Sequence, residues 1–225
     1  MNNWNGLASL SLACIEFILL INLTVFAEKN KINLMAMALV LLLTIYQAIE
    51  FLMCSLNLKF SYMAYLAFAD ISFLPPLNLY FILRYFGVNG KYLKMIFIPA
   101  IIFVVYYSLV IEKFAVVSCS VLYASYNYPL GSLYGLFYYL PTIAAIIYLI
   151  KRLREKKDPA KEKLIKVLLG GLLFVSLPVI TAFILLAMHN SRLLEIIESI
   201  MCKFAFVYAV CLAYFSLNNK INPDE

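Results

Sequence analysis

Seven long apolar runs constrain this sequence more than any other feature. They lie at Gly6–Ala27, Ile32–Cys54, Met63–Phe86, Met95–Ile111, Leu133–Ile150, Leu164–Met188 and Leu193–Leu217. A helix needs roughly 17 to 25 apolar residues to cross a bilayer, and each run meets that requirement. A membrane barrel would instead show alternating segments of about 10 residues. The sequence therefore predicts an all-α, polytopic membrane protein in which residues 1–225 form a single bundle of seven transmembrane helices.

The composition supports the same prediction. Hydrophobic residues make up 65% of the chain and charged residues 13%, and the mean hydropathy is +0.92. A soluble domain carries about a quarter of charged residues, because they cover the surface that faces water. No stretch of this chain is polar enough to form a separate soluble domain.

The distribution of basic residues predicts how the bundle is oriented. Fourteen lie in or beside the odd-numbered connections and the C-terminal tail: Lys29, Lys31, Arg84, Lys91, Lys94, Lys151, Arg152, Arg154, Lys156, Lys157, Lys161, Lys163, Lys166 and Lys220. The even-numbered connections hold three, Lys59, Lys113 and Arg192, and the N-terminal tail holds none. Basic residues are retained in the cytoplasm, so we expect a multi-pass cell-membrane protein with its N-terminus outside and its C-terminus inside. The net charge of +6 then needs no nucleic acid to explain it. The lipid bilayer, with anionic headgroups beside the basic connection at 151–166, is the expected partner.

Several polar residues interrupt the apolar runs. The candidate site residues are Glu16, Gln47, Glu50, Asp70, Glu198 and Lys203. A charge at the centre of a bilayer costs at least about 2.5 kcal/mol on insertion scales, so such a residue faces the bundle interior and has a partner. A helical rise of about 1.5 Å per residue puts Glu16, Asp70 and Lys203 at similar depths in the outer half. We expect a buried ion cluster there, which either holds the helices in place or binds a ligand or ion.

Pro75 and Pro76 lie in the middle of the third run. Two prolines remove two backbone donors and free the carbonyl groups of Ile71 and Ser72, one turn earlier. The sequence therefore predicts a helix break next to Asp70, which acts either as a hinge or as a static kink.

Two connections are longer than the others. The outer one, Glu112–Ser132, is rich in tyrosine and β-branched residues and is expected to form a hairpin or a cap over the bundle. The inner one, Lys151–Lys163, is expected to be two helical extensions broken at Asp158-Pro159. Six tyrosines around the outer connection are either interface anchors or the lining of an outward-facing pocket: Tyr123, Tyr126, Tyr128, Tyr134, Tyr138 and Tyr139.

The cysteines and the single histidine indicate neither a metal site nor an enzyme. The five cysteines show no CxxC spacing and no grouping with His189. Those in the apolar runs are expected to be packing residues, and Cys119 has no evident partner. Without a nucleophile, base and acid arranged as a set, we expect no catalysis and no bound cofactor.

Segment 45–94 carries the first half of a family resemblance. Glu50 closes the second run, Pro75-Pro76 interrupts the third, and Arg84–Gly87 (sequence RYFG) follows an aromatic-rich end. In these features the segment resembles the N-terminal seven-helix sensor region of prokaryotic histidine kinases.

Segment 134–180 carries the second half. Tyr134-Gly135 opens the fifth run and Leu177-Pro178 lies in the sixth, as in that family. The segment ESIMCK at 198–203 replaces the family's Asp-x-Thr-Pro-like start of the last helix, and no dimerisation helix or kinase domain follows. The resemblance implies a free-standing sensor or receptor-like module that signals through a separate cytoplasmic kinase or regulator.

A second resemblance is to microbial rhodopsins. Asp70 lies six residues before a proline, and Lys203 lies near the middle of the last run, where a lysine carries retinal in that family. However, Ala67 and Ser199 replace that family's arginine and aspartate, and the sixth run has no tryptophan. Retinal on Lys203 is therefore not expected.

The function expected from the sequence is that of a sensor. It binds a small ligand or responds to the state of the membrane in its outer half, where Glu16, Glu50, Asp70 and Lys203 lie, with Pro75-Pro76 as the flexing point. The alternative is a small-solute or proton-coupled transporter, in which the same carboxylates bind the coupling ion. A homodimer is compatible with either function.

Overall fold

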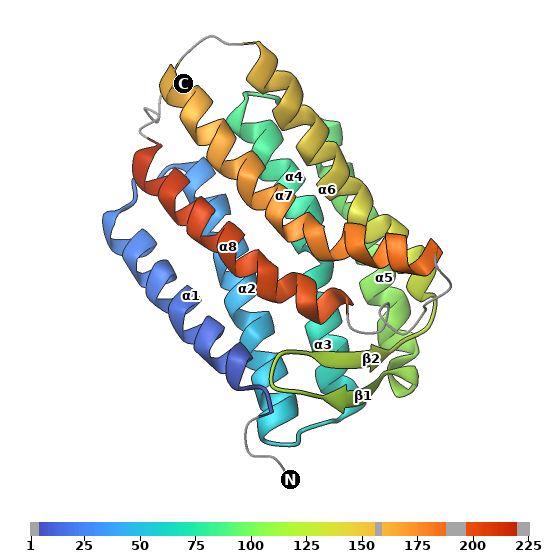
Figure 1. Ribbon diagram of the computed structural model, residues 1–225. Coiled ribbons are helices and arrows are strands. Elements are labelled where there is room, and N and C mark those ends of the chain that lie inside the picture. The colour runs from blue at the N-terminus through green and yellow to red at the C-terminus, as the bar shows by residue number, and fades with distance from the viewer. Residues whose placement is uncertain (1–4, 156–158, 188–196, 220–225) are drawn as a thin grey trace.

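The computed structural model describes residues 5–155, 159–187 and 197–219, and helices make up most of it (Figure 1). Seven helical segments are long and apolar enough to cross a membrane. The number of predicted runs is therefore confirmed, and their positions agree with the observed helices to within a few residues. The ends predicted at Met188 and Leu193 lie outside the described residues.

Most of the helices follow one another along the chain with short connections, and the hairpin lies in the longer one between α5 and α6. They are α1 Leu7–Phe26, α2 Lys31–Ser55, α3 Ser61–Ser72, α4 Leu74–Tyr85, α5 Ile98–Leu109, α6 Gly131–Arg154, α7 Pro159–Ala187 and α8 Ile197–Asn218. A 3-10 helix at Lys91–Phe97 leads directly into α5, and a second one at Ile111–Lys113 follows it. Because α6 ends at Arg154 and α7 begins at Pro159, the predicted helical extensions of the basic connection are confirmed.

The fold class all-α is correct for the bundle, but the structure also contains a small two-stranded sheet outside it. Strands β1 (Ala115–Cys119) and β2 (Ala124–Asn127) pair antiparallel and form the hairpin that was expected in the outer connection. The Ser120 hydroxyl holds the turn, since its oxygen accepts from the backbone N–H groups of Leu122 (3.2 Å) and Tyr123 (2.9 Å). The hairpin lies at the end of the bundle where α1 and α8 begin, opposite the end where α8 finishes (Figure 1).

The third apolar run is broken where the sequence predicts. Phe73 separates α3 from α4, and its backbone N–H donates to the Asp70 carbonyl over 3.2 Å. Pro75 and Pro76 lie in the first turn of α4, where a missing N–H leaves no hydrogen bond unmade. The Ser72 hydroxyl donates to the Phe68 carbonyl one turn earlier (2.6 Å), so side-chain bonding supports the end of α3.

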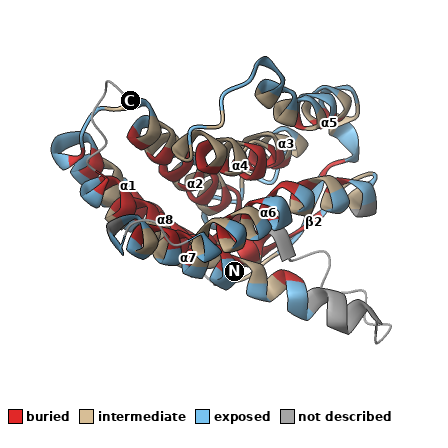
Figure 2. Ribbon diagram, turned by 90° about the horizontal axis from the view of Figure 1, so that it is seen from above, coloured by how far each residue is buried: buried red, intermediate tan, exposed pale blue. Residues whose placement is uncertain are grey.

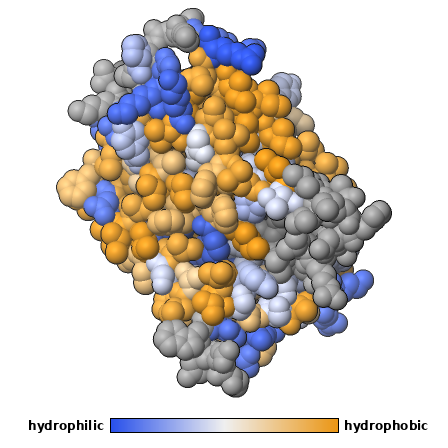
Figure 3. All heavy atoms as spheres, viewed as in Figure 1, coloured by the Kyte–Doolittle hydropathy of each residue, from blue (hydrophilic) through white to orange (hydrophobic). Residues whose placement is uncertain are grey.

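Buried residues face the inside of the bundle, and the outer helix faces are mostly exposed or intermediate (Figure 2). Gly171 shows how closely α7 and α8 pack, since a Cβ atom there would lie 2.7 Å from Tyr208 Cδ2 and 2.9 Å from Cys211 Sγ. Many large apolar side chains point outward, among them Val25, Leu34 and Ile147. In Figure 3, hydrophobic residues cover most of the visible face and hydrophilic residues gather toward its two ends.

The tyrosines near the hairpin are largely internal. Tyr126, Tyr134 and Tyr138 are buried, so they do not act as the interface anchors that were one expectation. Aromatic rings surround Phe68 beneath the hairpin, with ring centroids between 4.3 and 6.3 Å from it: Tyr107, Phe114, Tyr126, Tyr128 and Tyr134. These rings pack edge-on or tilted, which is the favoured geometry of aromatic pairs.

Candidate functional site

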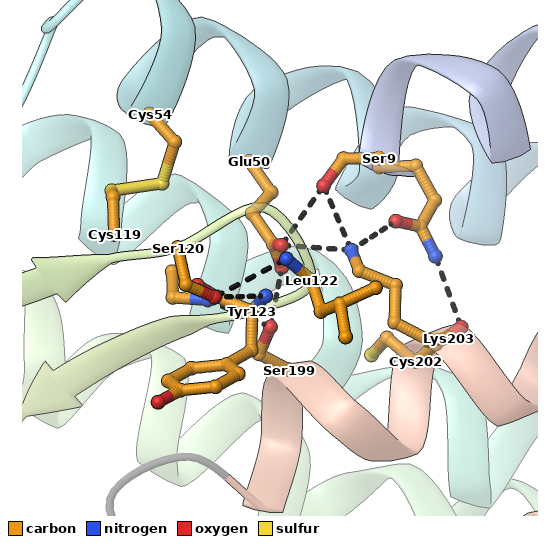
Figure 4. Close-up of polar contacts among 12 residues, drawn as sticks. Ser9, Glu50, Cys54, Cys119, Ser120, Leu122, Tyr123, Ser199, Cys202 and Lys203 are labelled. Atoms are coloured by element: carbon orange, nitrogen blue, oxygen red, sulfur yellow. Dashed lines mark hydrogen bonds and ion pairs between the residues drawn. A yellow bond between two sulfur atoms is a disulfide. The ribbon is translucent and has the colours of Figure 1, made fainter. Parts of the chain in front are cut away.

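Lys203 is the centre of a buried polar network near the hairpin end of the bundle (Figure 4). Its Nζ donates to Glu50 Oε1 (2.7 Å), Gln47 Oε1 (2.6 Å) and Ser9 Oγ (2.8 Å). An ammonium group has three N–H donors, and these three acceptors use them all. The lysine side chain is 12% exposed and that of Glu50 is 1% exposed, so the ion pair lies inside the protein.

Glu50 is held from both sides. Its Oε1 accepts from Lys203 and from the Ser9 hydroxyl (2.9 Å), and its Oε2 accepts from the Ser199 hydroxyl (2.9 Å). Hydrogen bonds to a charged group are worth about 1.5–3 kcal/mol each, so these contacts offset much of the cost of burying the carboxylate. We call the five residues Ser9, Gln47, Glu50, Ser199 and Lys203 the Lys203 network.

Helical spacing places the network residues of α2 on one helix face and those of α8 on another. Gln47 and Glu50 lie three residues apart on α2, and Ser199 and Lys203 lie four apart on α8, so each pair shares one helix face. Gln47 also donates from Nε2 to the Cys202 carbonyl over 3.0 Å, which joins α2 to the backbone of α8. The two serines were missed in the sequence, because a serine in an apolar helix usually bonds to its own backbone.

The structure brings together some of the expected site residues and separates others. Gln47, Glu50 and Lys203 are in direct contact, whereas Glu16 and Asp70 are not part of the network. Among the described residues, neither carboxylate oxygen of Glu16 has a hydrogen-bond partner, although the side chain is fully buried. The same holds for Oδ2 of Asp70. The side chain of Glu198 lies outside the described part of the chain.

The hairpin is bonded to this network. The backbone N–H of Ala124 in β2 donates to Ser199 Oγ over 3.0 Å, and Ser199 in turn donates to Glu50. The N-terminal end of α1 is bonded to the hairpin turn as well, through Gly6 N–H and the Ser120 carbonyl (3.0 Å). A displacement of the hairpin therefore acts directly on the partners of Glu50.

A disulfide between Cys54 and Cys119 forms a second link (Figure 4). This corrects the expectation that Cys54 is only a packing residue and that Cys119 has no partner. Cys54 lies one turn after Glu50 on α2, and Cys119 ends β1. The two cysteines are 65 residues apart, and no local spacing marks them as a pair.

A small cavity of about 50 Å³ lies beside the network, between α2, α4, α6, α7 and α8. Its polar lining comes from Asn78, Tyr138, Thr142, Cys202 and Tyr208, and Pro75 lies at its wall. Pockets for small molecules measure about 300–1,000 Å³, whereas one water molecule needs about 10–15 Å³. The cavity therefore has room for a few water molecules at the break between α3 and α4.

Within the described residues, no group of three or more His, Cys, Asp or Glu side chains is arranged to hold a metal ion. No protein-family model, curated protein or solved structure matches this chain. The function has therefore to be argued from the geometry of the Lys203 network and its links to the hairpin.

Proposed function

We propose that the chain spans the cell membrane seven times, with the hairpin outside and the end of α8 in the cytoplasm. The 14 basic residues around the odd-numbered connections and the C-terminal tail support this orientation, against three around the even-numbered ones. The Cys54–Cys119 disulfide supports it too, since disulfides persist outside the cytoplasm and the hairpin lies on the predicted outer side. The outward-facing apolar side chains would then contact lipid.

We further propose that this protein is a sensor that transmits a change at its outer end to a cytoplasmic partner. The observation that carries this proposal is the double attachment of the hairpin beside Glu50, by the disulfide to Cys54 of α2 and by the Ala124–Ser199 hydrogen bond. A ligand or a change in the membrane that moves the hairpin would disturb Ser199, which donates a hydrogen bond to Glu50 Oε2. The partial resemblance to histidine-kinase sensor regions points in the same direction.

Helices α2 and α8 connect the outer end of the bundle to its inner end and can transmit a shift between them. At the outer end they are joined by the ion pair between Glu50 and Lys203. At the inner end Asn33 of α2 donates to the Ser216 carbonyl (3.2 Å) and accepts from Asn219 Nδ2 (3.0 Å). Because polar contacts join the two helices at both ends, a shift at the outer end displaces their cytoplasmic ends together.

Native mass spectrometry of gently extracted protein tests the sensor proposal. We expect a soluble kinase or regulator to co-purify, and we expect its yield to change when Lys203→Met breaks the network. Lys59→Met, at an exposed position in an even-numbered connection, is the matched control and should leave the yield unchanged. A chain that purifies without any cytoplasmic partner, in both wild type and variant, contradicts the proposal.

The second candidate function is transport of a small solute or of protons. The observation that favours it is that, among the described residues, both carboxylate oxygens of Glu16 and Oδ2 of Asp70 are buried without a hydrogen-bond partner. A buried carboxyl group without a partner is suited to take up a proton or a cation. Uptake into proteoliposomes that is lost in Asp70→Asn would favour transport over sensing.

A further inference from the structure

Glu16 is the buried carboxyl group that the Lys203 network leaves unused. It is fully buried on α1, and among the described residues neither of its oxygens accepts a hydrogen bond. A carboxyl group in that position is stable only with a proton or a cation on it. An acidic residue in contact with water would need no explanation, but the buried position of Glu16 does.

Glu16 lies on the same face of α1 as the residue that Lys203 already contacts. Ser9, Ala13 and Glu16 are the buried positions in the first half of α1, and their spacing of four and three residues defines one helix face. Seven residues correspond to about 10 Å along the axis. Side chains on a helix lean toward its N-terminus, so the Glu16 carboxyl group is carried back toward Ser9. Helices α1 and α8 pack against each other, so Glu16 and Lys203 lie on neighbouring helices.

We propose that Lys203 has two alternative carboxylate partners, Glu50 in the arrangement described above and Glu16 in a second arrangement. This inference rests on the proposed sensor function and states how the same site is regulated. Movement of the ammonium group from Glu50 to Glu16 transfers one positive charge between two buried carboxyl groups. No covalent bond is made or broken.

The other ionisable groups nearby do not offer the same exchange. Asp70 on α3 has a buried oxygen without a hydrogen-bond partner among the described residues, but α3 contributes no residue to the Lys203 network. Tyr46 on α2 interacts with Glu50 and with Tyr126 of β2.

The exchange would release the hairpin. With Lys203 at Glu16, Glu50 keeps the hydroxyl groups of Ser9 and Ser199 but loses its cation. A buried carboxylate without a cation is poorly tolerated, so this arrangement is less stable and the segments joined through Glu50, Ser199 and Ala124 open more readily. The disulfide would still retain the hairpin beside α2, so the movement is limited and reversible.

A double-mutant cycle on thermal stability tests the exchange. The four proteins are wild type, Glu16→Gln, Glu50→Gln and the double variant, all purified in the same detergent. We expect Glu16→Gln to change Tm little and Glu50→Gln to lower it modestly, because Glu16 then takes the ammonium group. The double variant leaves Lys203 without a carboxylate, so its Tm should fall by about 2–4 °C or more beyond the sum of the single changes. Additive changes would overturn the proposal.

Asp70→Asn is the matched control, since it also converts a carboxyl group with a buried oxygen to an amide. Combined with Glu50→Gln it should give additive changes in Tm. If Glu50→Gln does not accumulate, Glu50→Asp replaces it in the cycle, because the shorter side chain withdraws the carboxylate from Lys203 without leaving a neutral group there. Coupling of the same size with Asp70 as with Glu16 would also overturn the proposal.

Hydrogen exchange separates the exchange of partners from a general loss of structure. In Glu50→Gln, the peptide that contains β2 should exchange faster, while the peptide around Glu16 should exchange no faster than in wild type. Equal acceleration of both peptides would contradict the proposal. These results do not depend on a cytoplasmic partner, so failure of the sensor function and failure of the exchange are distinguishable.

Discussion

Replacement of Lys203 by methionine tests whether the network stabilises the fold. Methionine keeps most of the volume and removes the charge, so the Glu50 carboxylate stays buried with only its two serine donors. Removal of one partner from a buried ion pair costs about 3–5 kcal/mol. No large discount for solvent applies, because the two side chains are 12% and 1% exposed.

The expected shift in melting temperature follows from the size of the chain. For a protein of 150–250 residues, 1 kcal/mol corresponds to about 2–4 °C, so Lys203→Met should lower Tm by about 6–20 °C. The assay is the loss of monodisperse protein from a size-exclusion column after heating in detergent. The wild type and Lys59→Met serve as references.

The double variant Lys203→Met/Glu50→Gln identifies the cause of the loss. When both charges are replaced by neutral groups of similar size, stability is often regained, because no charge remains buried without a partner. We therefore expect the double variant to be more stable than Lys203→Met alone. A Tm for Lys203→Met within about 1 °C of wild type, or a double variant that loses further stability, would refute this reasoning.

Two further predictions concern packing and the hairpin. Replacing Cys54 and Cys119 by serine should lower stability by about 4 kcal/mol, as expected for a bridge across 65 residues. Thermal unfolding measures this loss. In the wild type, these two thiols should become alkylated only after reduction of the disulfide. Gly171→Ala should cost about 1–3 kcal/mol, because the added Cβ would overlap the Tyr208 ring, whereas Gly170→Ala, with no atom within 4 Å, should cost nothing measurable. Equal Tm values for the two glycine variants would contradict the close packing of α7 and α8.

The saturation of Lys203 affects how the site can work. All three of its donors have partners, so a ligand has to displace one of them to bind there. The exposed ion pairs elsewhere, Arg152–Glu155 and Lys166–Glu162, are surface pairs that contribute little to stability. The buried network is thus the part of the described structure in which a change of partners has a large energetic consequence.

The sequence by itself determined the helices and the break in the third run. A span of 17–25 apolar residues can be read from the linear sequence, because a bilayer of fixed thickness requires only a certain length and hydropathy of each helix. The break at Phe73 is equally local, because Pro75 and Pro76 remove donors that a continuous helix needs. Depth can be counted from helical rise, and this placed Glu16, Asp70 and Lys203 in the same half of the bundle.

The tertiary structure alone decided which groups meet. Lys203 bonds to Glu50, and Glu16 has no hydrogen-bond partner among the described residues, although both carboxyl groups lie in the same half of the bundle. Depth along a helix says nothing about which neighbour its face turns toward, and this rotation is set by packing among helices that are distant in sequence. For the same reason Cys119 forms a disulfide with Cys54, which is 65 residues away in the sequence. The pairing of charges and of thiols in this protein follows from the packing of the bundle, whereas the helices themselves follow from local composition.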